Sequence, residues 1–291
     1  MRFVTFGVFE MSTFQTEIRS VLGVVNGMPT SDGAGVSLLR VIGTQQLDFI
    51  DPFLMLDEFK NDDPGAYVAG FPEHPHRGFE TVSYMKQGRM RHRDSAGNEG
   101  VIEDGGVQWM TAGKGIIHSE MPEQTEGLLW GYQLWVNLPA AHKMTAPRYQ
   151  DIQKESIPEV VRDGLKVRIM AGNFDGVSGA SETIWPIAYL DAELDAGASL
   201  THPIETGHNA LVFVYEGAVE IDGKIIAPHQ LAVLEQTGTL QLRALDDAGA
   251  GMLIITGKPI GEPVAKMGPF VMNTNAELHQ AVADFRAGKF A

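Results

Sequence analysis

Two short strings in this chain carry metal-binding residue types at alternate positions: His74-Pro75-His76 and His118-Ser119-Glu120. Side chains at positions i and i+2 of a β-strand project from the same face. Two such strands can therefore bring three imidazoles and one carboxylate to a common point. This set of ligands suits a divalent transition metal such as iron. The spacing predicts a metal site formed by His74, His76, His118 and Glu120.

Spacing alone leaves alternatives open. Nine histidines make one His-x-His pair unremarkable, and the second pair, 42 residues after the first, is what favours a site. Glu80 shares the parity of His74 and His76, so it could bind the metal, orient a ligand histidine through a hydrogen bond, or pair with an arginine. Three tryptophans flank the ligand region, where core packing is the default and lining of a substrate pocket is the alternative: Trp109, Trp130 and Trp135.

The expected ligand set also indicates what the metal would do. Three histidines and one carboxylate leave positions open on a six-coordinate metal, and open positions admit substrate and dioxygen. The carboxylate can accept a proton from a metal-bound substrate hydroxyl. A closed structural site is the alternative, but structural zinc sites usually contain cysteine, and this chain has none. A reactive site is therefore favoured.

The composition excludes several classes of function. The 291 residues are 44% hydrophobic and 20% charged, as in a globular protein with a full core. A formal charge of −15 argues against direct binding to nucleic acid or to anionic membranes. No apolar run is long enough to span a bilayer, and the short apolar run at residues 3–9 is not followed by a small-residue cleavage site. The absence of cysteine excludes disulfides and thiol catalysis, and we expect a cytoplasmic protein.

Short β-rich runs separated by glycine, asparagine and aspartate dominate the pattern, as in a β-sandwich or barrel. Such runs occur at residues 81–85, 134–136, 166–170, 211–215 and 252–255. One helix is expected near the C-terminus. A possible capping box joins Thr274 to Glu277, an apolar stripe follows, and Gly288 is a plausible stop.

An internal repeat divides the chain. Residues 76–88 resemble residues 205–217, with an offset of 129 residues, and both segments read as a polar turn, a strand and a glycine. The second copy lacks the paired ligands, because His202, His208 and His229 do not have the i, i+2 spacing. We therefore expect two tandem β-domains: residues 15–140 with the metal site, a linker at 141–165, and a degenerate copy with the terminal helix at 166–291.

Three long motifs resemble those of the pirin family. They are residues 74–82 (HPHRGFETV), residues 108–122 (QWMTAGKGIIHSEMP) and residues 133–139 (QLWVNLP). Asp51-Pro52-Phe53 and residues 284–290 (DFRAGKF) fit the same pattern, so the resemblance runs from about residue 15 to the C-terminus.

The resemblance implies a bicupin, that is, two tandem antiparallel β-barrels of the cupin or jelly-roll type with one short C-terminal helix. It assigns the ligands to His74, His76, His118 and Glu120, and it places Glu80 beside the site rather than on the metal. Trp109 is expected beside the site or in the pocket because it flanks the ligand region. One divalent metal per chain is implied, most commonly Fe(II), with Ni, Co, Mn, Cu or Zn also found in such sites.

Two kinds of function follow from this resemblance. Several relatives are similar to quercetin 2,3-dioxygenases, which open a flavonol ring with O2 and release carbon monoxide. Here Glu120 would act as the catalytic base on an aromatic hydroxy substrate. Other pirins are described as co-regulators of transcription or as partners of metabolic enzymes. The alternative is therefore a metal-binding regulatory protein that acts on a protein partner.

Overall fold

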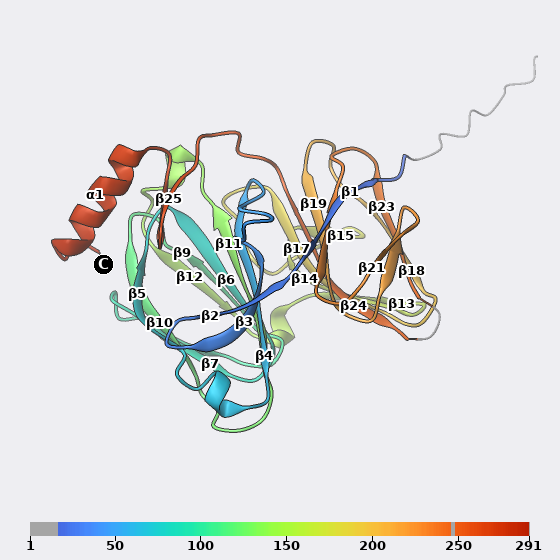
Figure 1. The fold of residues 1–291 in the computed structure, drawn as a ribbon, viewed down its shortest axis with the longest axis horizontal. Helices are drawn as coiled ribbons and strands as arrows, with labels where there is room; N and C mark the ends of the chain where they lie inside the picture. The colour runs from blue at the N-terminus through green and yellow to red at the C-terminus, as the bar shows by residue number, and fades with distance from the viewer. Residues whose placement is uncertain (1–16, 246–247, 291) are drawn as a thin grey trace, which may run out of the picture.

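Two β-sandwiches lie side by side in the computed structural model, which describes residues 17–245 and 248–290 (Figure 1). In each sandwich a seven-stranded antiparallel sheet is combined with a four-stranded one. The described strands form separate sheets in each half and do not close into a hydrogen-bonded ring. The expected all-β architecture of two tandem cupins with one short C-terminal helix is confirmed. The run at residues 3–9 lies outside the described residues.

The seven-stranded sheet of the first sandwich has the order β12 (Arg148–Ile152), β9 (Val107–Thr111), β6 (Phe79–Gln87), β11 (Leu129–Asn137), β4 (Phe53–Asn61), β3 (Val36–Ile42) and β2 (Met28–Asp32). Its four-stranded sheet has the order β5 (Phe71–His76), β10 (Ile116–Pro122), β7 (Met90–Asp94) and β8 (Glu99–Ile102).

The second sandwich repeats this plan. Its large sheet has the order β1 (Val21–Asn26), β22 (Gln230–Leu234), β19 (Asn209–Glu216), β24 (Ala250–Gly257), β17 (Ile187–Leu194), β14 (Leu165–Ala171) and β13 (Glu159–Arg162). Its small sheet has the order β18 (Ser199–Pro203), β23 (Thr239–Ala244), β20 (Val219–Ile221) and β21 (Lys224–Ile226). The predicted repeat places β6 and β19 in register, and both are the third strand of their large sheets.

The remaining elements of the described residues are two small hairpins, three short 3-10 helices and one α-helix. They are β15 (Asn173–Phe174) with β16 (Val177–Ser178), β25 (Ala265–Met267) with β26 (Phe270–Met272), η1 (Pro64–Ala66), η2 (Ala140–His142), η3 (Lys154–Ser156) and α1 (Asn275–Arg286). The predicted capping box of α1 is present, because the Thr274 side chain accepts from the Glu277 N–H and the Glu277 carboxylate accepts from the Thr274 N–H. Gly288 follows the helix at φ 66°.

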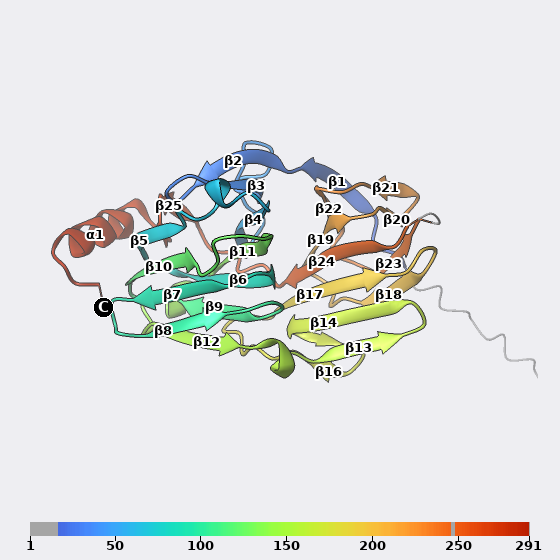
Figure 2. The ribbon, with the colours of Figure 1, turned by 90° about the horizontal axis from the view of Figure 1, so that it is seen from below.

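Both ends of the chain cross to the opposite sandwich. Strand β1 comes from the N-terminal region but pairs with β22 of the second sandwich, and Figure 2 shows β2 and β1 following one another along one side of the molecule. The hairpin β25–β26 comes from the C-terminal region but contacts the first sandwich through a bridge between Phe270 and Arg77.

Because of these exchanges, the boundaries of the expected ranges 15–140, 141–165 and 166–291 do not separate the two sandwiches cleanly. The predicted linker contains β12 and β13, each paired at an edge of a different large sheet. Residues 15 and 16 lie outside the described chain. Strands β12 and β13 form hydrogen bonds with backbone groups of the sheets that would otherwise be exposed. The linker-like composition of this segment did not indicate that it forms strands.

Apolar side chains fill the second sandwich but not the first. A large cluster occupies the interior of the second sandwich, and another lies between the two seven-stranded sheets, with side chains from both. The interior of the first sandwich holds a smaller cluster, and a cavity opens beside it. No helix in the described part of the chain combines the length and apolarity needed to cross a membrane.

Candidate metal centre

Neighbouring strands bring the predicted histidines together. In the small sheet of the first sandwich, β5 pairs antiparallel with β10, so that His74 lies directly opposite His118 and His76 lies opposite Ile116. His74 and His76 share a face of β5, as the i, i+2 spacing predicts. One nitrogen of each of the three imidazoles lies within 4.8 Å of one nitrogen of the others. The three rings could therefore hold one metal ion.

A local irregularity in β5 orients His74. The pairing shifts between His118 and Glu120, because His118 is opposite His74 whereas Glu120 is opposite Phe71. Within this irregular stretch, Nδ1 of His74 lies 2.8 Å from the Pro72 carbonyl oxygen. A carbonyl only accepts, so Nδ1 carries the proton, and the lone pair of Nε2 is left for a metal.

Burial keeps the other two imidazoles neutral. His76 and His118 are 2% and 0% exposed. Burial, and next the nearby histidines, lower the pKa of each ring well below its ordinary range. Within the part of the chain that the structure describes, neither nitrogen of His118 has a hydrogen-bond partner, nor does Nδ1 of His76. Buried nitrogens normally find partners, so neutral unpartnered imidazoles facing one another fit a metal ion well.

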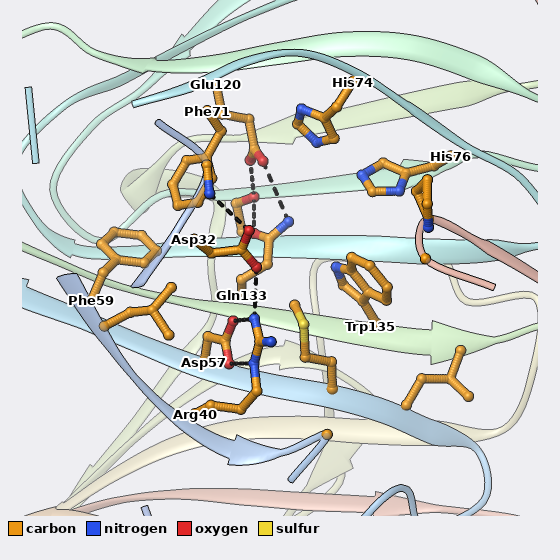
Figure 3. Close-up of a pocket in the computed structure, with 18 of the residues that line it drawn as sticks. Asp32, Arg40, Asp57, Phe59, Phe71, His74, His76, Glu120, Gln133 and Trp135 are labelled. Atoms are coloured by element: carbon orange, nitrogen blue, oxygen red, sulfur yellow. Dashed lines mark hydrogen bonds and ion pairs between the residues drawn. The ribbon is translucent and has the colours of Figure 1, made fainter. Parts of the chain in front are cut away.

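The carboxylate of Glu120 reaches the same cavity. Its Oε1 lies 2.6 Å from Oγ of Ser83, and its Oε2 accepts a long hydrogen bond of 3.4 Å from Nε2 of Gln133. Ser83 and Gln133 are direct partners on β6 and β11, and Figure 3 shows both hydrogen bonds at the cavity wall. The group within 4.8 Å comprises only the three imidazoles among the described residues. A metal-ligand role for Glu120 stays a prediction.

The end of the chain fixes the turn that follows His76. Arg77 donates to the Lys114 carbonyl at 2.6 Å and forms a salt bridge of 2.9 Å with Asp284 of α1. The buried ammonium of Lys143 donates to the carbonyls of Gly78 and Val271, at 2.8 and 3.1 Å. The C-terminal segment therefore helps to position a predicted ligand that lies about 200 residues earlier in the chain.

A cavity of about 710 Å³ extends from the histidines into the first sandwich. This volume lies within the range of small-molecule sites. Its lining is mainly apolar and includes Trp135, whose ring stands 5.2 Å from that of His76. Among the flanking tryptophans, Trp135 is thus a pocket residue, whereas Trp109 and Trp130 pack between the two large sheets.

Glu80 and Trp109 do not line this cavity. The chain turns at Gly78, with φ 91°, and Glu80 lies on β6, which belongs to another sheet. Glu80 is an even number of residues from His74 and His76, but because the turn lies between them its side chain does not share their face. Glu80 accepts a hydrogen bond of 2.6 Å from Thr111, and burial raises the pKa of its carboxyl group.

Sequence reasoning missed several polar residues of the cavity. Ser83 and Gln133 lie on the largely buried strands β6 and β11, and Arg40 forms ion pairs with Asp57 and Asp32 on another wall. Alternation along each strand could have shown which face of β6 holds Ser83 and which face of β11 holds Gln133. No signal in the sequence pairs these strands.

The second sandwich lacks the cluster, as the repeat comparison predicts. His202 lies on β18, the counterpart of β5, and stacks on Phe174 at 5.0 Å. Over residues 17–245 and 248–290, the histidines at 74, 76 and 118 form the one group of metal-ligand type. Apolar packing occupies the space that the cavity takes in the first sandwich.

Comparisons with known proteins agree with this architecture. The Pirin family model matches residues 35–136, and the Pirin C-terminal cupin domain matches residues 189–291. A Pseudomonas aeruginosa protein, provisionally named quercetin 2,3-dioxygenase, is 49% identical over 95% of this chain and 99% of its own length. Human pirin is 44% identical, over 89% of each chain. The crystal structure of a quercetin 2,3-dioxygenase from Acinetobacter baumannii has a TM-score of 0.88 and 36% identity, over 94% of this chain and 99% of that one. This chain belongs to the pirin family.

Proposed function

We propose that this protein is a metal-dependent dioxygenase that opens the ring of a flavonol or a related aromatic hydroxy compound with O2. The observation that carries the proposal is the group of neutral imidazoles with unpartnered nitrogens at the wall of a largely apolar cavity. The similarity to the Pseudomonas protein and to the Acinetobacter quercetin 2,3-dioxygenase supports the same reaction class.

In this proposal, His74, His76, His118 and Glu120 hold one divalent metal, Fe(II) in the first instance. A metal bound there supplies open positions for substrate and O2 and lowers the pKa of a bound hydroxyl group. Imidazole and carboxylate ligands also accept Ni, Co, Mn, Cu or Zn, so metal analysis of protein from its natural host is the direct test of metal identity.

Glu120 is the proposed general base. Its carboxylate faces the cavity beside His74 (Figure 3), where it can accept the proton of a substrate hydroxyl group. Ser83 and Gln133, which also line the cavity, hold the carboxylate in place. The apolar walls exclude water from the deprotonated substrate, which strengthens its interactions with the protein.

The test is oxygen consumption by metal-replete protein with quercetin, with carbon monoxide measured in parallel. One molecule of CO for each O2 consumed supports the proposal. We expect His76→Ala and Glu120→Ala to lose metal or turnover while they stay folded. Undiminished turnover by metal-replete Glu120→Ala would rule out the base role of Glu120.

A regulatory function is the second candidate, because the chain is about as similar to human pirin as to a provisionally named dioxygenase of Vibrio cholerae, at 44% and 43% identity. In that case the metal state would alter a surface that a protein partner recognises. Protein that is inert toward aromatic hydroxy compounds, but retains one partner only when metal is bound, would favour this alternative. The absence of cysteine and the expected cytoplasmic location are compatible with both functions.

A further inference from the structure

An ion pair lies on the cavity wall across from the histidines. Arg40 of β3 and Asp57 of β4 are direct cross-strand partners, and Figure 3 shows them at the end of the cavity away from His74 and His76. The guanidinium donates to both oxygens of Asp57, at 2.9 and 2.7 Å, and to Asp32 at 2.8 Å. Three charged groups therefore share one place in a mainly apolar wall.

Stability gives little reason for this pair. The side chain of Asp57 is 3% exposed and that of Arg40 is 25% exposed. Burial raises the pKa of Asp57, whereas the hydrogen bond to Asp57 raises the pKa of Arg40, so the two shifts have opposite effects on the charged pair and indicate no clear net stabilisation. Replacing a buried ion pair by apolar side chains is often neutral or stabilising. The surrounding side chains include Leu54, Met55 and Phe59, so an apolar wall would continue naturally here.

The Arg40–Asp57 pair also has donor and acceptor groups that remain available to a ligand in the cavity. A guanidinium has five N–H groups and a carboxylate about four acceptor positions. The hydrogen bonds found among the described residues use Nε and Nη2 of Arg40 but not Nη1. Asp57 accepts once at each oxygen, which leaves room for further donors. The wall can therefore accept an O–H donor and donate to the same hydroxyl oxygen.

Charge narrows the class of ligand. Five carboxylates line the cavity, at Asp32, Asp48, Asp57, Glu73 and Glu120, against the cations of Arg40 and Lys266. With the two charges of the proposed divalent metal added to those of Arg40 and Lys266, the five carboxylates still leave one negative charge in excess, which disfavours ligands that carry a carboxylate or phosphate. It favours neutral molecules that donate hydrogen bonds.

We infer that Arg40 and Asp57, with Asp32 behind them, form a subsite for phenolic hydroxyl groups at the end of the substrate remote from the metal. The inference rests on the proposed function and names its substrate class: neutral flat aromatics that are hydroxylated at both ends. The metal end of the cavity engages one hydroxyl group, and the subsite selects molecules that carry another across the cavity. An aromatic that lacks distal hydroxyl groups leaves the remaining donor of Arg40 and the remaining acceptor positions of Asp57 unused and covers them with an apolar ring, which is unfavourable.

The test compares two flavonols by calorimetric titration of metal-replete full-length protein without oxygen. Quercetin carries four hydroxyl groups besides the one at position 3, and 3-hydroxyflavone carries none of these four. We expect quercetin to bind about tenfold more tightly or better, as for a hydrogen bond to a buried charge. The double variant Arg40→Met, Asp57→Leu makes the wall apolar, and its preference should fall to about one. Asp57→Asn provides a second variant, expected to reduce the preference in part.

The matched control is Glu216→Gln, which breaks an ion pair with Lys60 on the same strand as Asp57 but outside the cavity. It should keep the full preference. A wild-type preference near one, or a double variant that keeps the preference, would overturn the inference. Oxygen consumption is assayed separately. If the protein oxidises quercetin but shows no binding preference, the subsite is refuted and the proposed activity is not. If it shows the preference but no turnover, the subsite is supported and the proposed activity is refuted.

Discussion

Ser83→Ala tests how the protein positions Glu120. The hydroxyl group of Ser83 lies 2.6 Å from Oε1 of Glu120, and Ser83 is 1% exposed. A buried hydrogen bond to a charged group contributes about 1.5–3 kcal/mol. At 1.36 kcal/mol per factor of ten, its loss corresponds to a decrease of about 10- to 150-fold in metal affinity or in kcat/KM. Gln133 is the other partner of this carboxylate, and its 3.4 Å hydrogen bond is too long to compensate fully.

Two measurements report the effect of Ser83→Ala. Competition with a chelator gives the dissociation constant of the metal, and oxygen uptake at limiting substrate gives kcat/KM. Ser83→Thr, which restores the hydroxyl group, should recover most of either loss. The matched control is Ser181→Ala, because Ser181 is buried and its hydroxyl group has no hydrogen-bond partner among the described residues. If Ser83→Ala keeps both parameters within about threefold of wild type, a range well below the loss expected for a charged hydrogen bond, the positioning role is refuted.

Three further predictions concern the metal site and its supports. His118→Ala should abolish stoichiometric metal binding in elemental analysis, whereas His202→Ala, a histidine of the second sandwich, should keep it. The pKa of His76 and that of His118 are held low by burial, so below the unfolded value near 6.5 only the unfolded chain gains these protons. The free energy of unfolding of metal-free protein should therefore fall with falling pH, by about 1.4 kcal/mol per unit for each histidine, and His118→Ala should show a shallower fall in urea denaturation. Burial lowers the pKa of Lys143 to about 8; between that value and the unfolded 10.5 the unfolded chain binds more protons, so wild type should gain up to about 3 kcal/mol over Lys143→Met as pH rises through this window. An equal pH dependence in both proteins would contradict this assignment.

The contrast between the two sandwiches shows what a cavity requires. Both have the same strand order, but the second is filled by branched aliphatic side chains. In the first, polar side chains such as Ser83, Gln133 and Glu120 face the interior. Polar side chains resist close apolar packing, so the interior stays open where they converge.

Local pattern was sufficient for much of the fold. Short β-rich runs between turn residues marked β6, β11, β14, β19 and β24, because residue types that suit a buried strand are visible in the strand's own sequence. The helix α1 was readable from its capping box for the same reason, since its contacts lie within three residues of one another. Strand pairing was not readable, and this is why the placement of β1 and of β25–β26 on the opposite sandwiches could not be foreseen.

The sequence by itself determined the histidine pair on β5, because residues two apart on one strand must share a face. Only the tertiary structure decided that His118 lies opposite His74, that Glu80 faces away, and that Arg40 and Asp57 stand across the cavity. Each of these depends on a turn or on the register between strands that are distant in sequence. Register depends on how the buried faces and turns of the whole sheet fit together, so the sequence of one strand does not identify the strand that pairs with it.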